Sequence, residues 1–442
     1  MKFRPNYSDV CILTLALGFA APQLRAKVIG TNLPAQSLTQ ECIDKLPKKE
    51  RAAWTAYLKR SEEQMRVDRA TLAAELKPGE VAPPQPAEGR GAFGQGMSLR
   101  HEDAYFGTAP ARHIADVIVS FQTPGGGWSK NMGFSGALRL PGQPYAANNL
   151  NAFPDPNDFD KPRDPQWNYV STLDNDATNT ELHFLAKVQA QTPGKDGDAY
   201  RASFIKGIHY LLAAQYPNGG FPQVYPLEGG YHDAITFNDN AVSESAETLT
   251  DVAGGKGEYA FAPADLRKQA GEAADRALAC ILKSQTVIDG KKTIWAQQED
   301  MLTLAPVSAR NYEPGALAAS ETADMLDYMM SLPNPSKELI ASIQAAVTWL
   351  KGAAVYGFAY TGNRTDGRKL VATPGAGALW SRYYSIPAQK PIFGDRDKTL
   401  HDDVNDLSLE RRNGYSWWSN GEQKTVDHYA DWAKTNGVAS GS

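Results

Sequence analysis

The stretch TLDNDATNTELHFL, residues 172–185, has a near-copy further along the chain, TFNDNAVSESAETL, at residues 236–249. Each stretch begins with a Thr, continues into an Asp/Asn triplet and then runs into a segment with helical periodicity. Asn and Asp are preferred at helix N-termini, where negative charge is also stabilised, so either triplet alone predicts a helix cap. Two aligned copies indicate, in addition, an internal repeat with polar loops in equivalent places.

The segments that precede these loops also repeat. Apolar, helix-like segments end at Gln122, Gln215 and Gln285, and in each case a turn with Gly leads on to an aromatic residue. A polar cluster and a new helical segment follow each turn, and the third cluster contains SARNYEPG, residues 308–315. These units predict a mainly α fold, an irregular α/α toroid of about three helical-hairpin repeats with short strands and long loops.

The toroid geometry predicts a shared cleft, because equivalent loops of such a fold emerge at one end. Asp174, Asp176, Asp239 and Arg310 would then lie close together although they are far apart in the sequence. Carboxylates gathered without a cation repel one another, which raises their pKa or costs stability. Oxygen ligands without His or Cys suit a hard cation such as calcium.

Composition excludes several classes of partner. The chain has 442 residues, is 42% hydrophobic and carries a formal net charge of −5. No strongly basic region points to nucleic acid. No segment approaches the roughly 18 apolar residues that a membrane-spanning helix needs.

Basic and aromatic residues in loop-like contexts indicate the kind of ligand. Lys130 lies in the first Gly-rich turn, and Arg382 and Arg396 lie in later loops. Each alone is most simply a surface charge. Together with nearby rings they predict a groove for an anionic polymer of flat sugar rings, an acidic polysaccharide. The rings are Trp128, Phe221, Trp380, Tyr383 and Tyr384.

The N-terminus has the pattern of an export signal. Lys2 and Arg4 precede a short apolar run, residues 10–21, and small residues follow. We expect cleavage after Ala26 and a secreted protein, extracellular or periplasmic. Cys42 and Cys280 would remain in the mature chain, either as one disulfide or as two free thiols.

Three parts are expected along the chain. Residues 1–26 form the signal peptide, and residues 27–100 form an N-terminal helical segment with a Pro/Gly-rich connection at residues 77–96. Residues 101–442 form the catalytic toroid. We expect the N-terminal helices to cap the main body as part of one domain.

Taken together, the motifs resemble those of the pectate lyases of polysaccharide lyase family 10. The resemblance covers roughly residues 104–437, and the motifs occur in the expected order. They are GGGWSKN, TLDNDATNTELHFL, YPNGGFPQVYP, FNDNAV, ARNYEPG, SRYYSI and PIFGDRD.

This resemblance implies calcium-dependent β-elimination of polygalacturonate, which leaves an unsaturated uronide. It implies that Arg310 is the base that removes the C5 proton, and that Asp174, Asn175 and Asp239 hold calcium. It further implies that Arg382 and Arg396 bind the substrate, and the groove pattern adds Lys130 and Tyr383 as substrate-binding residues. The partner is then pectate, with no nucleic acid or membrane, and a monomer is expected.

An arginine base needs a physical explanation, because a free guanidinium stays protonated at ordinary pH. Neighbouring positive charge and exclusion of water disfavour the charged form. We therefore expect activity to be highest at alkaline pH.

Two other functions fit the same residues. In a glycoside hydrolase, Asp174 or Asp176 would be the acid and Asp239 the base, without calcium and without a double bond in the product. A carbohydrate-binding protein would use the arginines and rings for capture alone. Fold does not separate these functions.

Overall fold

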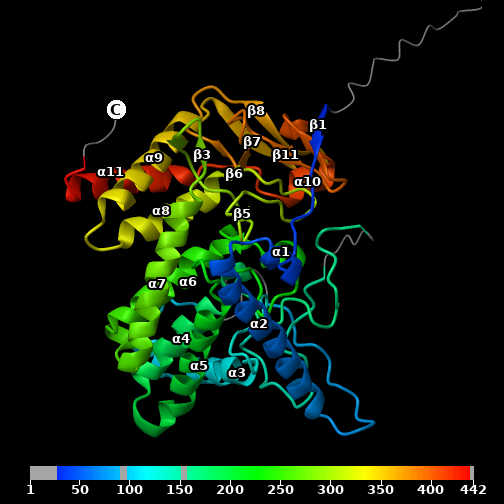
Figure 1. The fold of residues 1–442 in the computed structure, drawn as a ribbon, viewed down its shortest axis with the longest axis vertical. Coiled ribbons are helices and arrows are strands. Elements are labelled where there is room, and N and C mark those ends of the chain that lie inside the picture. Colours follow the sequence, from blue (N-terminus) through cyan, green and yellow to red (C-terminus); the bar gives the residue numbers. More distant parts are fainter. Residues whose placement is uncertain (1–26, 90–96, 151–156, 439–442) are drawn as a thin grey trace, which may run out of the picture.

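The computed structural model describes residues 27–89, 97–150 and 157–438, so the predicted signal peptide lies outside the described residues. Helices dominate, and they pack as the predicted irregular α/α toroid, which confirms the fold class (Figure 1). The helices are α1 (Gln40–Asp44), α2 (Lys48–Ala74), α3 (Ala109–Ser120), α4 (Asn179–Gln191), α5 (Asp198–Ala214), α6 (Ala241–Gly254), α7 (Ala264–Ser284), α8 (Ala319–Ser331), α9 (Lys337–Ala353), α10 (Leu409–Gly414) and α11 (Glu422–Thr435).

The strands are short and pair antiparallel, mostly in twos. Sheet β1-β12-β11 joins the N-terminal strand to the C-terminal part of the chain, and β7 and β8 form a hairpin. The strands are β1 (Val28–Thr31), β2 (Ile235–Thr236), β3 (Val287–Ile288), β4 (Lys291–Lys292), β5 (Gln298–Glu299), β6 (Leu317–Ala318), β7 (Phe358–Asn363), β8 (Gly367–Ala372), β9 (Trp380–Ser381), β10 (Tyr383–Tyr384), β11 (Phe393–Gly394), β12 (Thr399–His401) and β13 (Trp418–Ser419).

The glutamines that end the repeated helices join one unit to the next. Gln122, Gln215 and Gln285 each donate from the side-chain amide to one carbonyl in their own turn and one in a later helix of the toroid. Because both acceptors are backbone groups, the amide fixes the turn against the neighbouring helix. The acceptor pairs are Gly126 and Ser203, Gly219 and Ala273, and Thr293 and Ser342, at 2.8–3.0 Å.

The aromatic residue after each turn is buried beneath the helix that precedes it. The indole nitrogens of Trp128, Trp295 and Trp380 donate to the carbonyls of Ile118, Ile281 and Leu350 at 2.7–2.8 Å. Phe221 takes this place in the second unit and is fully buried. Trp380 follows α9 and the β7–β8 hairpin, so the structure adds a fourth unit to the three that the sequence pattern predicts.

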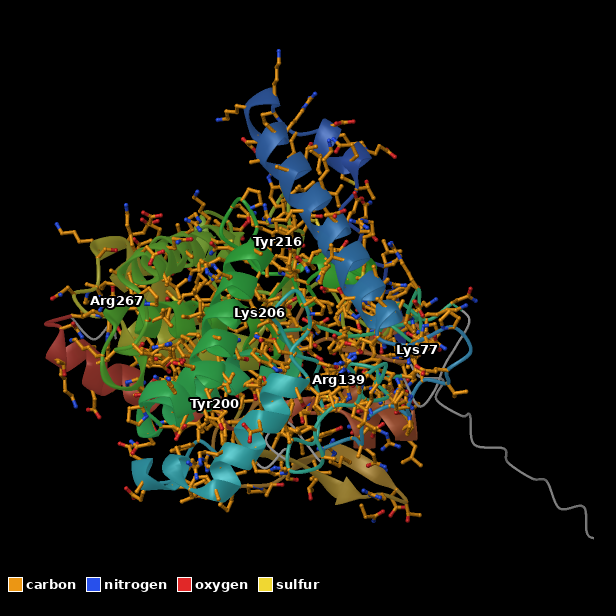
Figure 2. All side chains as sticks on the ribbon, turned by 90° about the horizontal axis from the view of Figure 1, so that it is seen from below. Lys77, Arg139, Tyr200, Lys206, Tyr216 and Arg267 are labelled. Carbon is orange, nitrogen blue, oxygen red and sulfur yellow. The ribbon has the colours of Figure 1, made fainter. Side chains whose placement is uncertain are left out.

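The N-terminal segment packs on the toroid and shares its core. Residues of α2, Trp54 and Tyr57, belong to the same hydrophobic cluster as the toroid helices, and both rings contact Tyr216. At the other end of α2, Glu75 pairs with Arg139 at 2.6 Å. Figure 2 shows α2 along the outside of the body, reaching from the region of Tyr216 to that of Arg139.

Two further expectations can be compared with the structure. Cys42 and Cys280 are free thiols. None of the helices in the described part of the chain is long and apolar enough to cross a membrane.

Candidate active site

The two Asp/Asn triplets form short turns that pack against each other, η2 (Asp174–Asp176) and η5 (Asn238–Asn240). Asn175 and Asp239 have φ angles of 54° and 47°, a left-handed conformation that Asn and Asp tolerate better than most residues. No side-chain hydrogen bond caps the following helices, α4 and α6. The cap explanation is therefore wrong for both triplets.

A polar cavity of about 170 Å³ lies where the loops of the repeat units meet. The structure brings Lys130, Arg310 and Arg382 to this cavity together with Asp174, Asn175 and Asp239, as the sequence predicts. The cavity is thus lined by carboxylates and by cations. Its remaining lining residues are Tyr169, Gln223, Tyr231, Asn238, Gln297, Gln298, Ala309 and Glu313.

Asp174 is the most strongly bound carboxylate of the cavity. Its Oδ2 forms an ion pair with Lys130 Nζ, and its Oδ1 accepts a hydrogen bond of 2.7 Å from the Gln223 amide. Burial opposes its ionisation, but the Lys130 charge, a hydrogen bond with Asp239 and the Arg310 charge outweigh burial and lower the pKa of Asp174 to about 2. Asp174 is therefore a carboxylate at any ordinary pH.

Asp239 lies beside Asp174 and has the opposite pKa shift. Burial, the negative charge of Asp174 and the hydrogen bond between the two side chains raise the pKa of Asp239 well above its ordinary value. Two negative charges side by side in this cavity are therefore unfavourable without a cation. Asn238 also donates to Asp239 Oδ2, at 2.6 Å.

The donor set fits a calcium ion. Two close carboxyl groups, with the amide of Asn175 beside them, are hard oxygen ligands at a place where the raised pKa of Asp239 shows that a cation would relieve repulsion. No group of three or more His, Cys, Asp or Glu side chains arranged to hold a metal occurs in the part of the chain that the structure describes. The protein ligands would therefore be two carboxylates and amide oxygens.

Arg310 is held by Glu313, from the same tight turn. Arg310 Nε and Nη2 donate to the two Glu313 oxygens at 2.8 and 2.6 Å, while Tyr415 donates to Glu313 at 2.6 Å. Burial disfavours the charged guanidinium, but the charge of Glu313 outweighs burial and raises the pKa of Arg310. The pKa of Glu313 falls to about 2, because Arg310 outweighs its burial. Arg310 and Glu313 therefore form an ion pair within the wall of the cavity.

Arg382 is fixed by hydrogen bonds to α8 and to η5. Its guanidinium donates to Glu321 Oε1 from Nε at 3.0 Å and from Nη2 at 2.5 Å, and Nη2 also donates to Asn238 Oδ1 at 2.7 Å. Burial opposes its charge, but Glu321 outweighs burial and raises the pKa of Arg382. Arg382 is thus a permanent, rigidly held cation.

The predicted aromatic lining is wrong. The five rings proposed for the groove are 0–2% exposed and lie in the core, where they support the loops from behind. Tyr383 donates to Gln297 and shares a hydrogen bond of 2.6 Å with Tyr415, so its predicted contact with substrate is corrected to a supporting role. The rings that do face the cavity are Tyr169 and Tyr231, and Lys130 Nζ lies 3.5 Å from the centroid of the Tyr169 ring.

Two further candidates lie outside the cavity wall. Asp176 is hydrogen-bonded to Glu244 in the first turn of α6. Arg396 pairs with Glu410 at 3.0 Å, and its guanidinium lies 5.3 Å from the centroid of the Tyr312 ring. Arg310 lies 5.2 Å from the same centroid, so Arg396 is a neighbour of the site, and its contact with substrate stays a prediction.

The cavity residues that sequence reasoning missed have a signal in the repeat. Two positions after each buried aromatic residue stands a side chain that lines the cavity, and the first and fourth are the predicted Lys130 and Arg382. The second and third, Gln223 after Phe221 and Gln297 after Trp295, follow the same rule. Alignment of the turns on their aromatic residues would have identified both glutamines.

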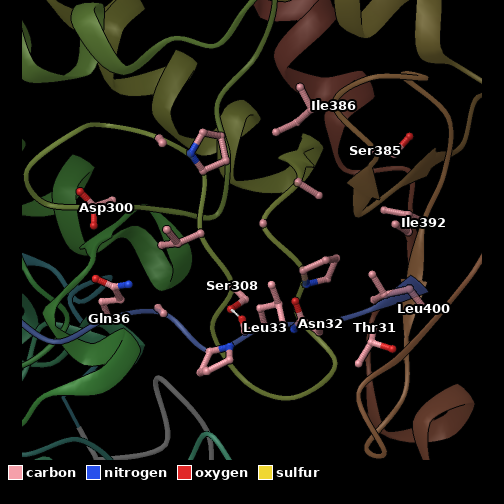
Figure 3. Close-up of a pocket in the computed structure, with 18 of the residues that line it drawn as sticks. Thr31, Asn32, Leu33, Gln36, Asp300, Ser308, Ser385, Ile386, Ile392 and Leu400 are labelled. Atoms are coloured by element: carbon pink, nitrogen blue, oxygen red, sulfur yellow. Dashed lines mark hydrogen bonds between the residues drawn. The ribbon is translucent and has the colours of Figure 1, made fainter. Parts of the chain in front are cut away.

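A second cavity, of about 680 Å³, lies behind the Arg310 turn (Figure 3). Its walls include the N-terminal segment 31–36, the loop that precedes Arg310 and the chain near Ile386 and Ile392. It is mainly apolar and does not contain the charged residues described above.

Fixed cations and a close pair of carboxyl groups line one cavity of an α/α toroid, an arrangement that suits a protein acting on an acidic polysaccharide. The family model for pectic acid lyase matches residues 122–426, and the chain belongs to this family. It is a pectate lyase.

Solved structures of a family 10 polysaccharide lyase are similar to this chain. A family 10 polysaccharide lyase from Cellvibrio cellulosa is 28% identical over 75% of this chain and 94% of that chain, with a TM-score of 0.63. A mutant of the family 10 lyase from the same organism, in complex with trigalacturonic acid, is also 28% identical, covers 76% of this chain and 97% of that chain, and has a TM-score of 0.62. A search of curated proteins found no match.

Proposed function

We propose that this enzyme cleaves polygalacturonate by calcium-dependent β-elimination, with Arg310 as the base. The observation that carries the proposal is the cavity that Arg310 and Arg382 line together with the carboxyl pair Asp174 and Asp239. The similarity to a lyase solved with trigalacturonic acid supports a galacturonate polymer as the substrate.

Substrate binding follows from the fixed charges. Lys130 and Arg382 would attract the uronate carboxylates, and Arg382, held rigidly by Glu321, suits a planar carboxylate. Asp174, Asn175 and Asp239 would hold calcium. When bound, calcium supplies positive charge that stabilises the enolate-like anion formed at the sugar carboxylate.

Arg310 would then move the proton. Nε and Nη2 are used by Glu313, which makes Nη1 the atom to accept the proton from C5. Arg310 must first lose a proton to solvent. The electron pair of the C5–H bond then forms the C4–C5 double bond, the C4–O bond breaks, and the leaving oxygen takes a proton from water. Because the Glu313 pair raises the pKa of Arg310, we expect activity to increase with pH.

We also propose that the enzyme is exported after cleavage following Ala26. The family's polysaccharide substrate supports this location.

The test is incubation with polygalacturonate, with and without a chelator, from pH 6 to 10. Ultraviolet absorbance reports the conjugated double bond, and a parallel assay reports reducing ends. We expect absorbance that requires calcium and increases with pH. Reducing ends without absorbance would point to hydrolysis, and a flat or acidic pH profile would exclude Arg310 as the base.

A further inference from the structure

One asparagine outside the family-matched region binds the Arg310 turn from behind. The side-chain Nδ2 of Asn32 donates to the carbonyls of Arg310 at 3.3 Å, Asn311 at 3.1 Å and Glu313 at 3.0 Å. Asn32 is only 6% exposed. The match to the pectic acid lyase family begins at residue 122, 90 positions later.

The carbonyls that Asn32 binds belong to a very tight turn. Glu313 N–H donates to the Arg310 carbonyl at 2.9 Å, and Ala309 N–H donates to the Glu313 carbonyl at 3.1 Å. The turn therefore points three carbonyl oxygens at one place, and their dipoles repel unless a donor lies among them. The two N–H groups of a primary amide, shared among three acceptors, meet this need.

The opposite side of the same turn carries the catalytic groups. Glu313 Oε2 accepts from both the backbone N–H and Nε of Arg310, at 3.0 and 2.8 Å. Glu313 thus binds the donors of the turn, and Asn32 binds its acceptors. The position of the guanidinium in the cavity depends on both.

Asn32 is itself fixed by the chain on both sides of it. Strand β1, directly before it, pairs with β12, and the Asn32 N–H donates to the Lys398 carbonyl at 2.7 Å. Directly after it, the Leu33 carbonyl accepts from Ser308 Oγ, two residues before Arg310 (Figure 3). Further along, Leu38 N–H donates to Asp233 of the toroid at 2.9 Å.

We propose that Asn32 is a positioning residue for the Arg310 turn, so that the N-terminal segment completes the active site of this enzyme. The inference rests on the proposed function of Arg310. It assigns a role in catalysis to a part of the chain that lies outside the family match and contributes no residue to the lining of the cavity.

The test compares Asn32→Ala and Asn32→Asp with the wild type in the absorbance assay, with kcat and KM measured separately. The Ala variant removes the side-chain donor that the three carbonyls share, and the Asp variant places an oxygen where that donor was. We expect kcat to fall at least about tenfold in both, because a small displacement of a reacting group has a large effect on rate. KM should change less than about threefold, since Lys130 and Arg382 remain in place.

Two controls separate positioning from folding. Lys27→Ala removes an ion pair of 2.6 Å with Asp402 at the start of the same segment, and Asn363→Ala removes an exposed asparagine from the β7–β8 turn. Both should keep the wild-type kcat. Each variant is assayed about 20 °C below its own Tm, so that lower stability alone does not reduce the rate.

The outcomes are distinguishable. If the wild type forms no unsaturated product, the proposed function fails whatever the variants do. If the wild type is active and both Asn32 variants keep kcat, or if Lys27→Ala loses as much kcat as they do, the positioning role is overturned.

Discussion

At the scale of single residues, Arg310 has to meet two opposing requirements. Glu313 fixes the guanidinium by two hydrogen bonds, which a base aimed at one carbon atom needs. The same carboxylate raises the pKa of Arg310, which makes the neutral form rare. The geometry therefore fixes the position of the guanidinium at the expense of its basicity. In our proposal, alkaline pH increases the neutral fraction of Arg310, and calcium stabilises the anion that forms when the proton leaves.

We predict that Arg310→Lys lowers kcat at least about a thousandfold, equivalent to roughly 4 kcal/mol of transition-state stabilisation. Lysine keeps the charge but lacks the planar group that lets two nitrogens bind Glu313 while a third faces the cavity. Steady-state kinetics measure the change. Arg364→Lys, in the exposed β7–β8 turn, is the matched control and should have wild-type kcat. A lysine variant with more than a tenth of wild-type activity would contradict the proposal.

We predict that Asp239→Asn weakens calcium binding at least about tenfold, because it removes one of only two carboxylates available to the ion. Calorimetry on the Arg310→Lys variant, with trigalacturonate present, measures this affinity without turnover. Asp366→Asn, an exposed change in the β7–β8 turn, should leave the affinity unchanged. Equal affinities for the Asp239 variant and its parent would place the ion elsewhere.

At the scale of elements, the repeat is built from one polar and one aromatic residue per turn. The glutamine joins its turn to a later helix, and the aromatic residue packs under the helix before it. Between them these residues set the direction of the extended chain that follows. That is why side chains two positions after the aromatic residue, such as Gln223 and Gln297, reach the common cavity.

We predict that Gln285→Ala lowers the free energy of unfolding by about 1–3 kcal/mol, because it leaves the buried carbonyls of Thr293 and Ser342 without their donor. Thermal unfolding measures the loss, and Gln40→Ala, at the exposed start of α1, should be nearly neutral. A neutral Gln285 variant would mean that the glutamine is not a structural link.

At the scale of the whole molecule, buried titratable groups make stability depend on pH. His232 is 7% exposed and accepts or donates a hydrogen bond of 2.8 Å with Tyr169. Burial is the main cause that lowers its pKa from 6.5 to about 4. Above pH 6.5 the residue is neutral in both states and costs nothing. Below pH 6.5, His232 takes up a proton in the unfolded chain but stays neutral in the folded protein, so stability decreases as the pH falls towards 4.

We predict that this histidine accounts for about 3 kcal/mol of the stability lost between pH 6.5 and 4, at 1.36 kcal/mol per unit of pKa. Urea unfolding of the wild type and of His232→Asn at several pH values measures it, through the difference between the two pH slopes. Identical slopes would show that folding does not lower the pKa of His232.

The sequence by itself determined what depends on neighbours along the chain. Helical periodicity, turns with Gly and the repeated Gln and aromatic positions predict the helices and the toroid. Asp174, Asp239 and Arg310 were predicted to share a cleft from their places in the repeat units. The pattern of basic residues in loops added Lys130 and Arg382, and the motif resemblance supported Arg382. In the structure all five line one cavity.

Only the tertiary structure decided which way the side chains face and which distant segments support them. Tyr383 is the neighbour of Arg382 in the sequence, and both have the local pattern of a loop residue. Its side chain is nevertheless buried, because its hydroxyl forms hydrogen bonds in the core with Gln297 and Tyr415, which are far away in the sequence. Asn32 stands in an unremarkable extended segment, and it reaches the Arg310 turn only because β1 pairs with β12. Local sequence encodes local backbone geometry, whereas burial and long-range hydrogen bonds are set by partners that meet only when the chain is folded.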